Sequence, residues 1–167
     1  MDFYRLPFHA FSDQRPWTFN LVEDVDQLNR RIAREAVDAI RQAGEKQRQV
    51  MMVTPVGPLD YSYWARLCNA ENVSCAPLLS LGMDEYLDEE DKPIAASHPL
   101  SFRRYIESSL IENLELQLRP DPENILFPDP EYPERTTKRI VAHGGADICF
   151  GGCGITGHFA FNDPPEP

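Results

Sequence analysis

The hydrophobic pattern of the chain is most regular near its beginning, where apolar residues recur at steps of three and four. The recurring positions are Val25, Leu28, Ile32, Ala36, Ala39 and Ala43. Because an α-helix repeats about every 3.6 residues, this spacing predicts an amphipathic helix. Asp24 is expected to cap its N-terminus, and Gly44 is expected just beyond its C-terminus.

Three short apolar runs predict buried strands, at residues 50–53, 78–81 and 146–150. Helices are expected over residues 61–70 and 134–143. Between them, another helix is expected to begin with Pro99 in its first turn. Residues 119–133 carry five prolines and predict a loop. Strands that alternate with helices predict βαβ units and an α/β fold with an open, mostly parallel sheet.

The domain organisation follows from this pattern. Residues 1–23 are aromatic and irregular and are expected to form an arm on a surface or on a neighbouring subunit. Residues 24–167 are expected to form a single α/β domain. Three strands make a thin sheet, and the chain stops soon after its richest motif, so the domain resembles the N-terminal part of a longer one. A sheet that ends early exposes an edge and apolar faces, which predicts a homo-oligomer.

Composition narrows the function classes. The chain has 167 residues and a net charge of −11, which argues against nucleic acid as a partner. No apolar run approaches the about 20 residues needed to span a bilayer, and the N-terminus lacks a secretory signal. A cytoplasmic protein without membrane contact is therefore expected. The four cysteines form no CxxC pair, so buried or incidental thiols and no metal site are expected.

The glycine-rich segment 151–163 carries the strongest chemical signal. It reads Gly-Gly-Cys-Gly-Ile-Thr-Gly-His-Phe-Ala-Phe-Asn-Asp and directly follows an expected strand. A strand, a glycine turn and then His158 and Asp163 are typical of a small-molecule site at the carboxyl edge of an α/β sheet. Asp163 could orient His158 as a general base, or His158 could be a turn histidine that bonds to backbone.

The same segment fits the dinucleotide pattern G-x-G-x-x-G at Gly152, Gly154 and Gly157. That fingerprint opens a long helix in a first βα unit, whereas Pro164 and Pro165 follow here too soon. We therefore expect no nicotinamide or flavin cofactor.

Two further segments follow expected strands. Asp84 and Glu85 end the second strand, where successive side chains point to opposite sides, so one of them can face the crevice. The alternative is a solvated acidic loop. Residues 54–58 form the first βα turn, where backbone N–H groups can receive an anion, although two prolines remove two donors.

Taken in order, three motifs resemble the glucosamine-6-phosphate deaminase (isomerase) family. They are Met83-Asp84-Glu85-Tyr86, His98-Pro99-Leu100-Ser101-Phe102, and the segment from Gly151 to Pro164. The resemblance implies a Rossmann-like fold of the class shared with ribose-5-phosphate isomerase and CoA transferases. The related 6-phosphogluconolactonases carry Asp-Glu-Arg where this chain has Asp84-Glu85-Tyr86.

The resemblance also implies a reaction and roles. The family converts an amino-sugar phosphate to fructose 6-phosphate and ammonia, without a cofactor. Asp84 resembles the acid–base group that moves a proton between C2 and C1. His158 resembles the group that opens the sugar ring, and Asp163 stands where the family has the Glu that orients it. The residues expected around the sugar phosphate are Thr54, Val56, Gly57, Glu85, Gly152, Gly154 and Gly157.

The chain departs from the family pattern at three places. Thr156 replaces an Asp of the family's ring-opening group and cannot ionise. Residues 54–58 lack the family's Thr-Gly-Ser-Thr type of loop, and the family's basic phosphate residues lie beyond its glycine motif. Two alternatives therefore stand beside the deaminase: a non-catalytic relative that binds a sugar phosphate or a partner subunit, and a lactonase-like hydrolase that uses His158 on water.

Overall fold

The computed structural model describes residues 18, 20–57, 59–154, 156–158, 160 and 162. Most of the expected N-terminal arm, and Asp163 in the glycine-rich segment, lie outside the described residues. Within the described part of the chain, no helix is long and apolar enough to cross a membrane.

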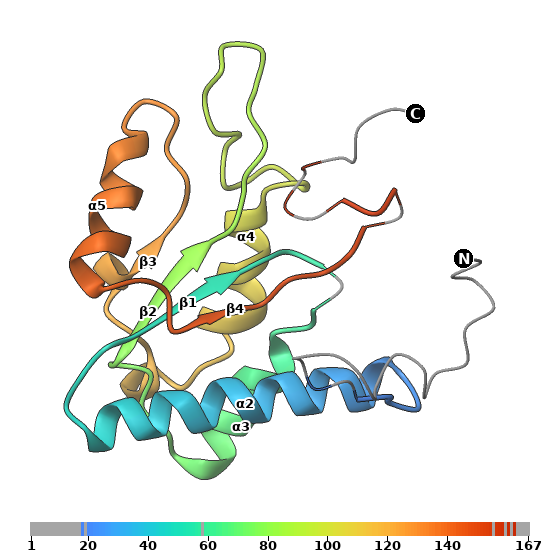
Figure 1. Ribbon diagram of the computed structural model, residues 1–167, viewed down its shortest axis with the longest axis vertical. Coiled ribbons are helices and arrows are strands. Elements are labelled where there is room, and N and C mark those ends of the chain that lie inside the picture. Colours follow the sequence, from blue (N-terminus) through green and yellow to red (C-terminus); the bar gives the residue numbers. More distant parts are fainter. Residues whose placement is uncertain are drawn as a thin grey trace.

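The chain folds around a parallel sheet of four strands (Figure 1). The strands are β1 (Val50–Thr54), β2 (Leu78–Gly82), β3 (Ile125–Leu126) and β4 (Ile148–Cys149), in the spatial order β3-β2-β1-β4. All three pairings are parallel. The expected α/β class and parallel sheet are confirmed. Strand β3 lies in the proline-rich segment that the sequence predicted to be a loop, so that prediction was wrong for these two residues.

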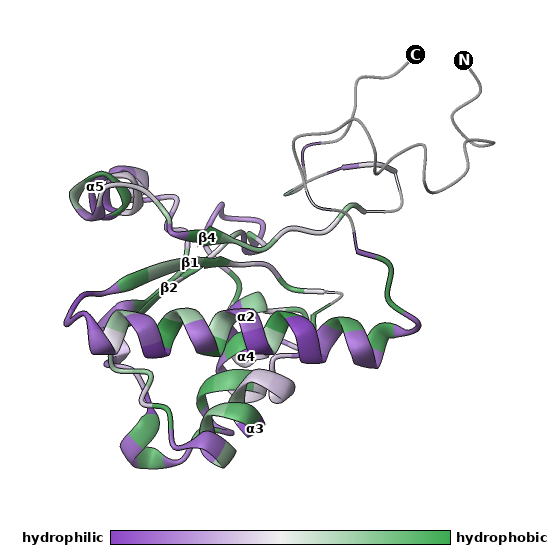
Figure 2. Ribbon diagram, turned by 60° about the horizontal axis from the view of Figure 1, so that its bottom comes forward, coloured by the Kyte–Doolittle hydropathy of each residue, from purple (hydrophilic) through white to green (hydrophobic). Residues whose placement is uncertain are grey.

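Helices cover both faces of the sheet unequally. The helices α2 (Val25–Glu45), α3 (Ser62–Glu71) and α4 (Phe102–Ile106) lie on one face, and α5 (Pro133–His143) lies on the other (Figure 2). Helix α4 continues into a π-helical turn, η2 (Glu107–Ile111). Two short 3-10 turns, η3 (Leu116–Leu118) and η4 (Pro122–Asn124), lead to β3.

The two ends of α2 test the expected capping residues. The Asp24 carboxylate accepts a hydrogen bond from the backbone N–H of Gln27 at 2.7 Å, which confirms the N-cap. Gly44 was expected beyond the C-terminus, but the helix runs through Glu45, because the N–H of Lys46 still reaches the carbonyl of Gln42.

The start of α4 also differs from the expectation. Pro99 lies before the helix, not in its first turn. The N-cap is Ser101, whose hydroxyl accepts from the N–H of Arg104 at 3.2 Å. Helix α5 begins at Pro133 and ends at His143, and its C-cap residue, Gly144, has a φ of 94° that favours glycine.

The main core lies between the sheet and helices α2, α3 and α4. Its largest fully buried members include Trp64, Ile40, Met52, Leu78, Ile106, Leu110 and Leu114. Phe150, which is 8% exposed, follows β4 and packs edge-on against Trp64 with ring centroids 6.4 Å apart. Cys68 and Cys75 are buried as expected. Cys149 was expected in a buried strand but is exposed, because its neighbour Phe150 takes the side of β4 that faces the core.

Candidate active site

The candidate active site lies where the strand order reverses. The chain moves from β1 to β2 to β3 toward one edge of the sheet, and then α5 carries it back so that β4 pairs with the other side of β1. The carboxyl ends of β1 and β4 therefore lie at a topological switch point of the sheet. Ligands bind open α/β sheets in crevices at such points, at the carboxyl ends of the strands.

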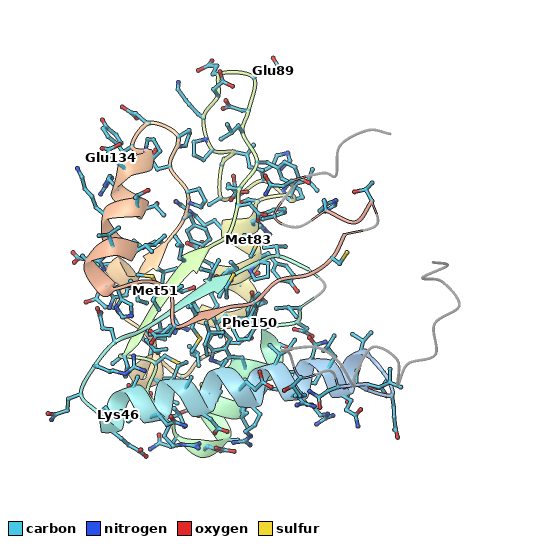
Figure 3. All side chains as sticks on the ribbon, viewed as in Figure 1. Lys46, Met51, Met83, Glu89, Glu134 and Phe150 are labelled. Atoms are coloured by element: carbon cyan, nitrogen blue, oxygen red, sulfur yellow. The ribbon has the colours of Figure 1, made fainter. Side chains whose placement is uncertain are left out.

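A cavity of about 260 Å³ occupies this position. It is lined by residues that follow β1, β2 and β4 and by the first residue of α4. Its lining consists of Pro55, Val56, Gly57, Met83, Asp84, Phe102, Gly152, Cys153, Gly154, His158 and Ala160. In Figure 3, Met83 marks the end of β2 and Phe150 marks the start of the segment after β4, the two segments that supply Asp84 and His158. Six of the residues expected from the sequence thus meet in one place: Asp84, His158, Val56, Gly57, Gly152 and Gly154.

The imidazole of His158 is held by the glycine turn. Its Nδ1 lies 2.7 Å from the hydroxyl of Thr156. The ring lies against Gly154, where an added Cβ would come within 2.1 Å of Nε2, so only glycine leaves room for it. The turn closes through two backbone hydrogen bonds, from Gly154 N–H to the His158 carbonyl and from Gly157 N–H to the Gly154 carbonyl, both 2.9 Å. Gly157, with a φ of 85°, shapes the turn without lining the cavity.

Asp84 also lines the cavity and is partly buried. Burial raises its pKa above the ordinary value, and the negative charge of Glu85 raises it further. A carboxyl group with a raised pKa exchanges protons more readily near neutral pH, which suits acid–base chemistry.

Glu85 turns away from the cavity although it follows Asp84 directly. Its carboxylate accepts hydrogen bonds from the hydroxyl of Ser101 and the backbone N–H groups of Phe102 and Arg103, each at 2.9 Å. The two neighbouring carboxylates therefore face different surroundings, as their positions after β2 predict.

The segment after β1 is fixed by hydrogen bonds with Tyr61, the N-cap residue of α3, and with side chains of α4 and α2. The hydroxyl of Tyr61 donates to the Pro55 carbonyl, and that of Tyr105 donates to the Leu59 carbonyl, both at 2.6 Å. The amide oxygen of Asn29 accepts from the N–H of Asp60 at 3.0 Å. Burial raises the pKa of Tyr61 far above its ordinary value, so its hydroxyl stays protonated.

Thr54, which was expected near the substrate, lies elsewhere. It is fully buried, and its hydroxyl bonds to the hydroxyl of Ser80 and to the carbonyl of Leu81, both at 3.2 Å. Its side chain joins β1 to β2 and does not line the cavity.

Comparison with known proteins supports the resemblance seen in the sequence. No protein-family model matches the chain. Curated proteins named glucosamine-6-phosphate deaminase do match: 28% identity over 153 residues in Histophilus somni, 27% over 151 residues in Porphyromonas gingivalis, and 26% over 151 residues in Caenorhabditis elegans. The chain is therefore similar in sequence to these glucosamine-6-phosphate deaminases. These matches cover 84–86% of this chain but only 53–54% of the relatives, so the chain spans about half the length of the curated relatives it matches.

Some cavity residues of this chain were not singled out from the sequence as binding residues. They are Pro55, Met83, Phe102, Cys153 and Ala160. All of these residues except Pro55 lie within motifs that the family resemblance already marked, so their positions in those motifs were the available signal. Pro55 lies in the first βα turn, where the sequence shows it only as a position without a backbone N–H donor.

The charge of the lining limits its chemistry. Asp84 and His158 are its acid–base groups, with the thiol of Cys153 beside them, and the described lining contains no Arg or Lys. Across the described residues, no cluster of three His, Cys, Asp or Glu side chains is placed to hold a metal ion. This arrangement can transfer a proton to or from a neutral part of a ligand.

Proposed function

We propose that the chain carries the proton-transfer site of an amino-sugar phosphate isomerase, acting on glucosamine 6-phosphate to give fructose 6-phosphate and ammonia. The observation that carries this proposal is the meeting of Asp84 and His158 at one cavity from segments 74 positions apart along the chain. The names of the homologous proteins support the same substrate.

In this proposal His158 opens the ring. Its imidazole passes a proton between the ring oxygen and the C1 hydroxyl, which gives the open-chain aldose. Thr156 supports the ring through Nδ1 and so sets the orientation of the imidazole. A hydroxyl orients His158 but adds no negative charge to stabilise an imidazolium, so we expect slower ring opening than with a carboxylate.

Asp84 then acts on the open chain. Its carboxylate takes the proton from C2 and returns a proton at C1, while a proton passes from the amino group to the C1 oxygen, so a C2=N imine replaces the C1=O double bond. Water then adds to C2 of the imine and ammonia leaves, which gives the C2 ketone. The raised pKa of Asp84 favours both halves of this transfer. Asp163, which lies outside the described residues, keeps its predicted role beside His158.

The phosphate group has a less complete site. Val56 and Gly57 line the cavity after β1, in a turn where backbone N–H groups can receive an anion. Positive charge is absent from the described lining. We therefore propose that this part of the chain binds the sugar more tightly than the phosphate.

The direct test is the release of ammonia and fructose 6-phosphate from glucosamine 6-phosphate. Release that is lost in Asp84→Asn and kept in Asp91→Asn supports the proposal, because Asp91 is exposed in the acidic loop and does not line the cavity. Equal release by both variants would assign the reaction to another site.

Thr156 favours a second candidate, a non-catalytic relative that binds a sugar phosphate or a partner subunit. Here the cavity keeps its shape, but the histidine lacks the charge that the family supplies. Calorimetry with glucosamine 6-phosphate separates the two candidates. Binding without product release would select the second.

We propose a homo-oligomer in the cytoplasm as the setting of this site. Strand β4 forms one edge of the four-stranded sheet and consists of two residues, which leaves backbone groups open to pairing. Sedimentation velocity tests the assembly, and a clean monomer would contradict it.

A further inference from the structure

The carboxylate of Glu85 joins two segments that flank the cavity. Its Oε1 accepts from the backbone N–H of Phe102 at 2.9 Å and from that of Tyr86 at 3.0 Å. Its Oε2 accepts from the N–H of Arg103 and from the hydroxyl of Ser101, both at 2.9 Å. One side chain therefore ties the end of β2 to the first turn of α4.

These bonds satisfy the start of α4. The first N–H groups of a helix have no partner within it, and a negative charge at that end is favourable. Glu85 receives the N–H groups of Phe102 and Arg103, and the Ser101 hydroxyl receives that of Arg104. Burial alone would raise the pKa of Glu85, but its backbone and hydroxyl donors outweigh burial and hold the pKa below its ordinary value.

The carboxylate has little capacity left for a ligand. An ionised carboxylate offers about four acceptor positions, and Glu85 already accepts four hydrogen bonds from its own chain. It is also absent from the cavity lining. Direct binding of substrate by Glu85, as the sequence predicted, would require these bonds to be exchanged.

Both joined segments place residues at the cavity. Asp84 precedes Glu85 directly, and Phe102 is the first residue of α4. The rings of Tyr86 and Phe102 are in contact, with centroids 4.9 Å apart. We propose that Glu85 is a positioning residue, whose bonds to Ser101, Phe102 and Arg103 fix Asp84 and Phe102 relative to each other at the cavity. Its effect on turnover rests on the proposed function, whereas its effect on the geometry does not.

The first test measures Asp84 without any substrate. Glu85→Gln keeps the size of the side chain, removes its charge and turns an NH₂ group toward N–H donors. We expect the pKa of Asp84, followed by NMR at its carboxyl carbon and assigned with Asp84→Asn, to fall, since a negative neighbour is lost and the cavity loosens. Glu89→Gln is the matched control, because Glu89 lies at the outer tip of the acidic loop (Figure 3). An Asp84 pKa that moves equally in both variants, or in neither, would overturn the proposal.

The second test measures turnover of glucosamine 6-phosphate. A positioning residue acts on the reacting geometry, so kcat should fall about tenfold or more in Glu85→Gln while KM stays within about threefold. A higher KM with unchanged kcat would instead make Glu85 a substrate ligand and overturn the proposal.

A further variant and the turnover of the unaltered protein complete these tests. Ser101→Ala removes one of the four bonds and should move both readouts in the same direction by less; a folded Ser101→Ala protein with neither readout changed would contradict the proposal. If the unaltered protein shows no turnover, the proposed function fails, and the titration of Asp84 still decides the role of Glu85.

Discussion

Two regions of the sheet are built very differently. The packed unit, residues 25–82, contains α2, β1, α3 and β2, and it supplies most of the buried core. The returning unit, residues 125–154 and 156–158, contains β3, α5, β4 and the glycine turn. Its strands have two residues each, α5 has no buried residue, and Phe150 is its one buried member of the core.

The difference separates stability from chemistry. Burial of apolar side chains is the main source of folding free energy, so the packed unit is expected to determine whether the chain folds. The returning unit contributes His158 and the glycine turn, whose positions depend on a few hydrogen bonds and on the absence of a Cβ at Gly154. Substitutions in the packed unit should therefore mainly change stability, and substitutions in the returning unit should mainly change turnover.

The largest expected effect is a gain at Thr156. Thr156→Asp places a carboxylate beside Nδ1 of His158, and restoring one positioned acid–base contribution should raise turnover by about 10² to 10⁴-fold. Steady-state kinetics with glucosamine 6-phosphate measures this change. Thr156→Val removes the hydroxyl at similar size and should slow turnover. An unchanged rate in Thr156→Asp would place the slow step away from this pair.

Gly154 should show the next largest effect. In Gly154→Ala the new Cβ would overlap the imidazole, so His158 must move, and a displacement of about 1 Å can cost about 10²-fold in rate. Gly151→Ala is the matched control, because a Cβ at Gly151 meets nothing within 4 Å. The imidazole proton resonances of His158 should shift in Gly154→Ala alone. Equal shifts in both variants would mean that the close approach does not hold the ring.

A paired valine substitution tests the packed unit. Val37 in α2 is 0% exposed, whereas Val141 in α5 is 72% exposed. Val37→Ala should lower the free energy of unfolding by about 2 kcal/mol, because buried methyl groups are lost and a cavity remains. Val141→Ala should change it by less than about 0.5 kcal/mol. Urea titrations give both values, and similar losses would remove the distinction between the two units.

The smallest expected effect concerns Asp147, which ties β4 to β1. Its carboxylate accepts from the Met51 N–H and from Arg48, each at 2.9 Å, and bonds to His143 at 2.8 Å. Burial would raise its pKa, but His143, Met51 and Arg48 lower it from 3.8 to about 2. A carboxylate whose pKa is lowered by folding stabilises the fold at pH values above its unfolded-state pKa. This stabilisation is lost as the pH falls toward its folded-state pKa. Asp147 should therefore contribute about 1 kcal/mol that disappears between about pH 4 and pH 2.

Urea titrations at several pH values test this contribution. Asp147→Asn should flatten the loss of stability in that acid range. Glu89→Gln, an exposed carboxylate at the loop tip, should leave it unchanged. The same acid slope in Asp147→Asn and in the unaltered protein would contradict the role of Asp147.

The packed unit was predictable because its signals are local. The three- and four-residue spacing gave α2, and the two apolar runs gave β1 and β2, since periodicity needs only neighbouring residues. Strand β3 was not predictable in this way. Ile125 and Leu126 lie among prolines, and they form a strand because Ser80 and Leu81 of β2 offer a partner.

The site was predictable only in part, for the same physical reason. Motifs identified Asp84 and His158, and the cavity brings both together. The bonds of Glu85 to Ser101 and of Tyr105 to Leu59 join residues 16 and 46 positions apart, so no local pattern shows them. The role of Glu85 and the burial of Thr54 therefore emerged only from the fold.

The central claim is that Asp84 moves the proton between C2 and C1 of an amino-sugar phosphate. The most direct measurement follows deuterium uptake at C2 when glucosamine 6-phosphate is incubated with the protein in D₂O. The account predicts uptake with the unaltered protein and none above background with Asp84→Asn, while calorimetry shows that the variant still binds the sugar. Uptake at the same rate in Asp84→Asn would contradict it.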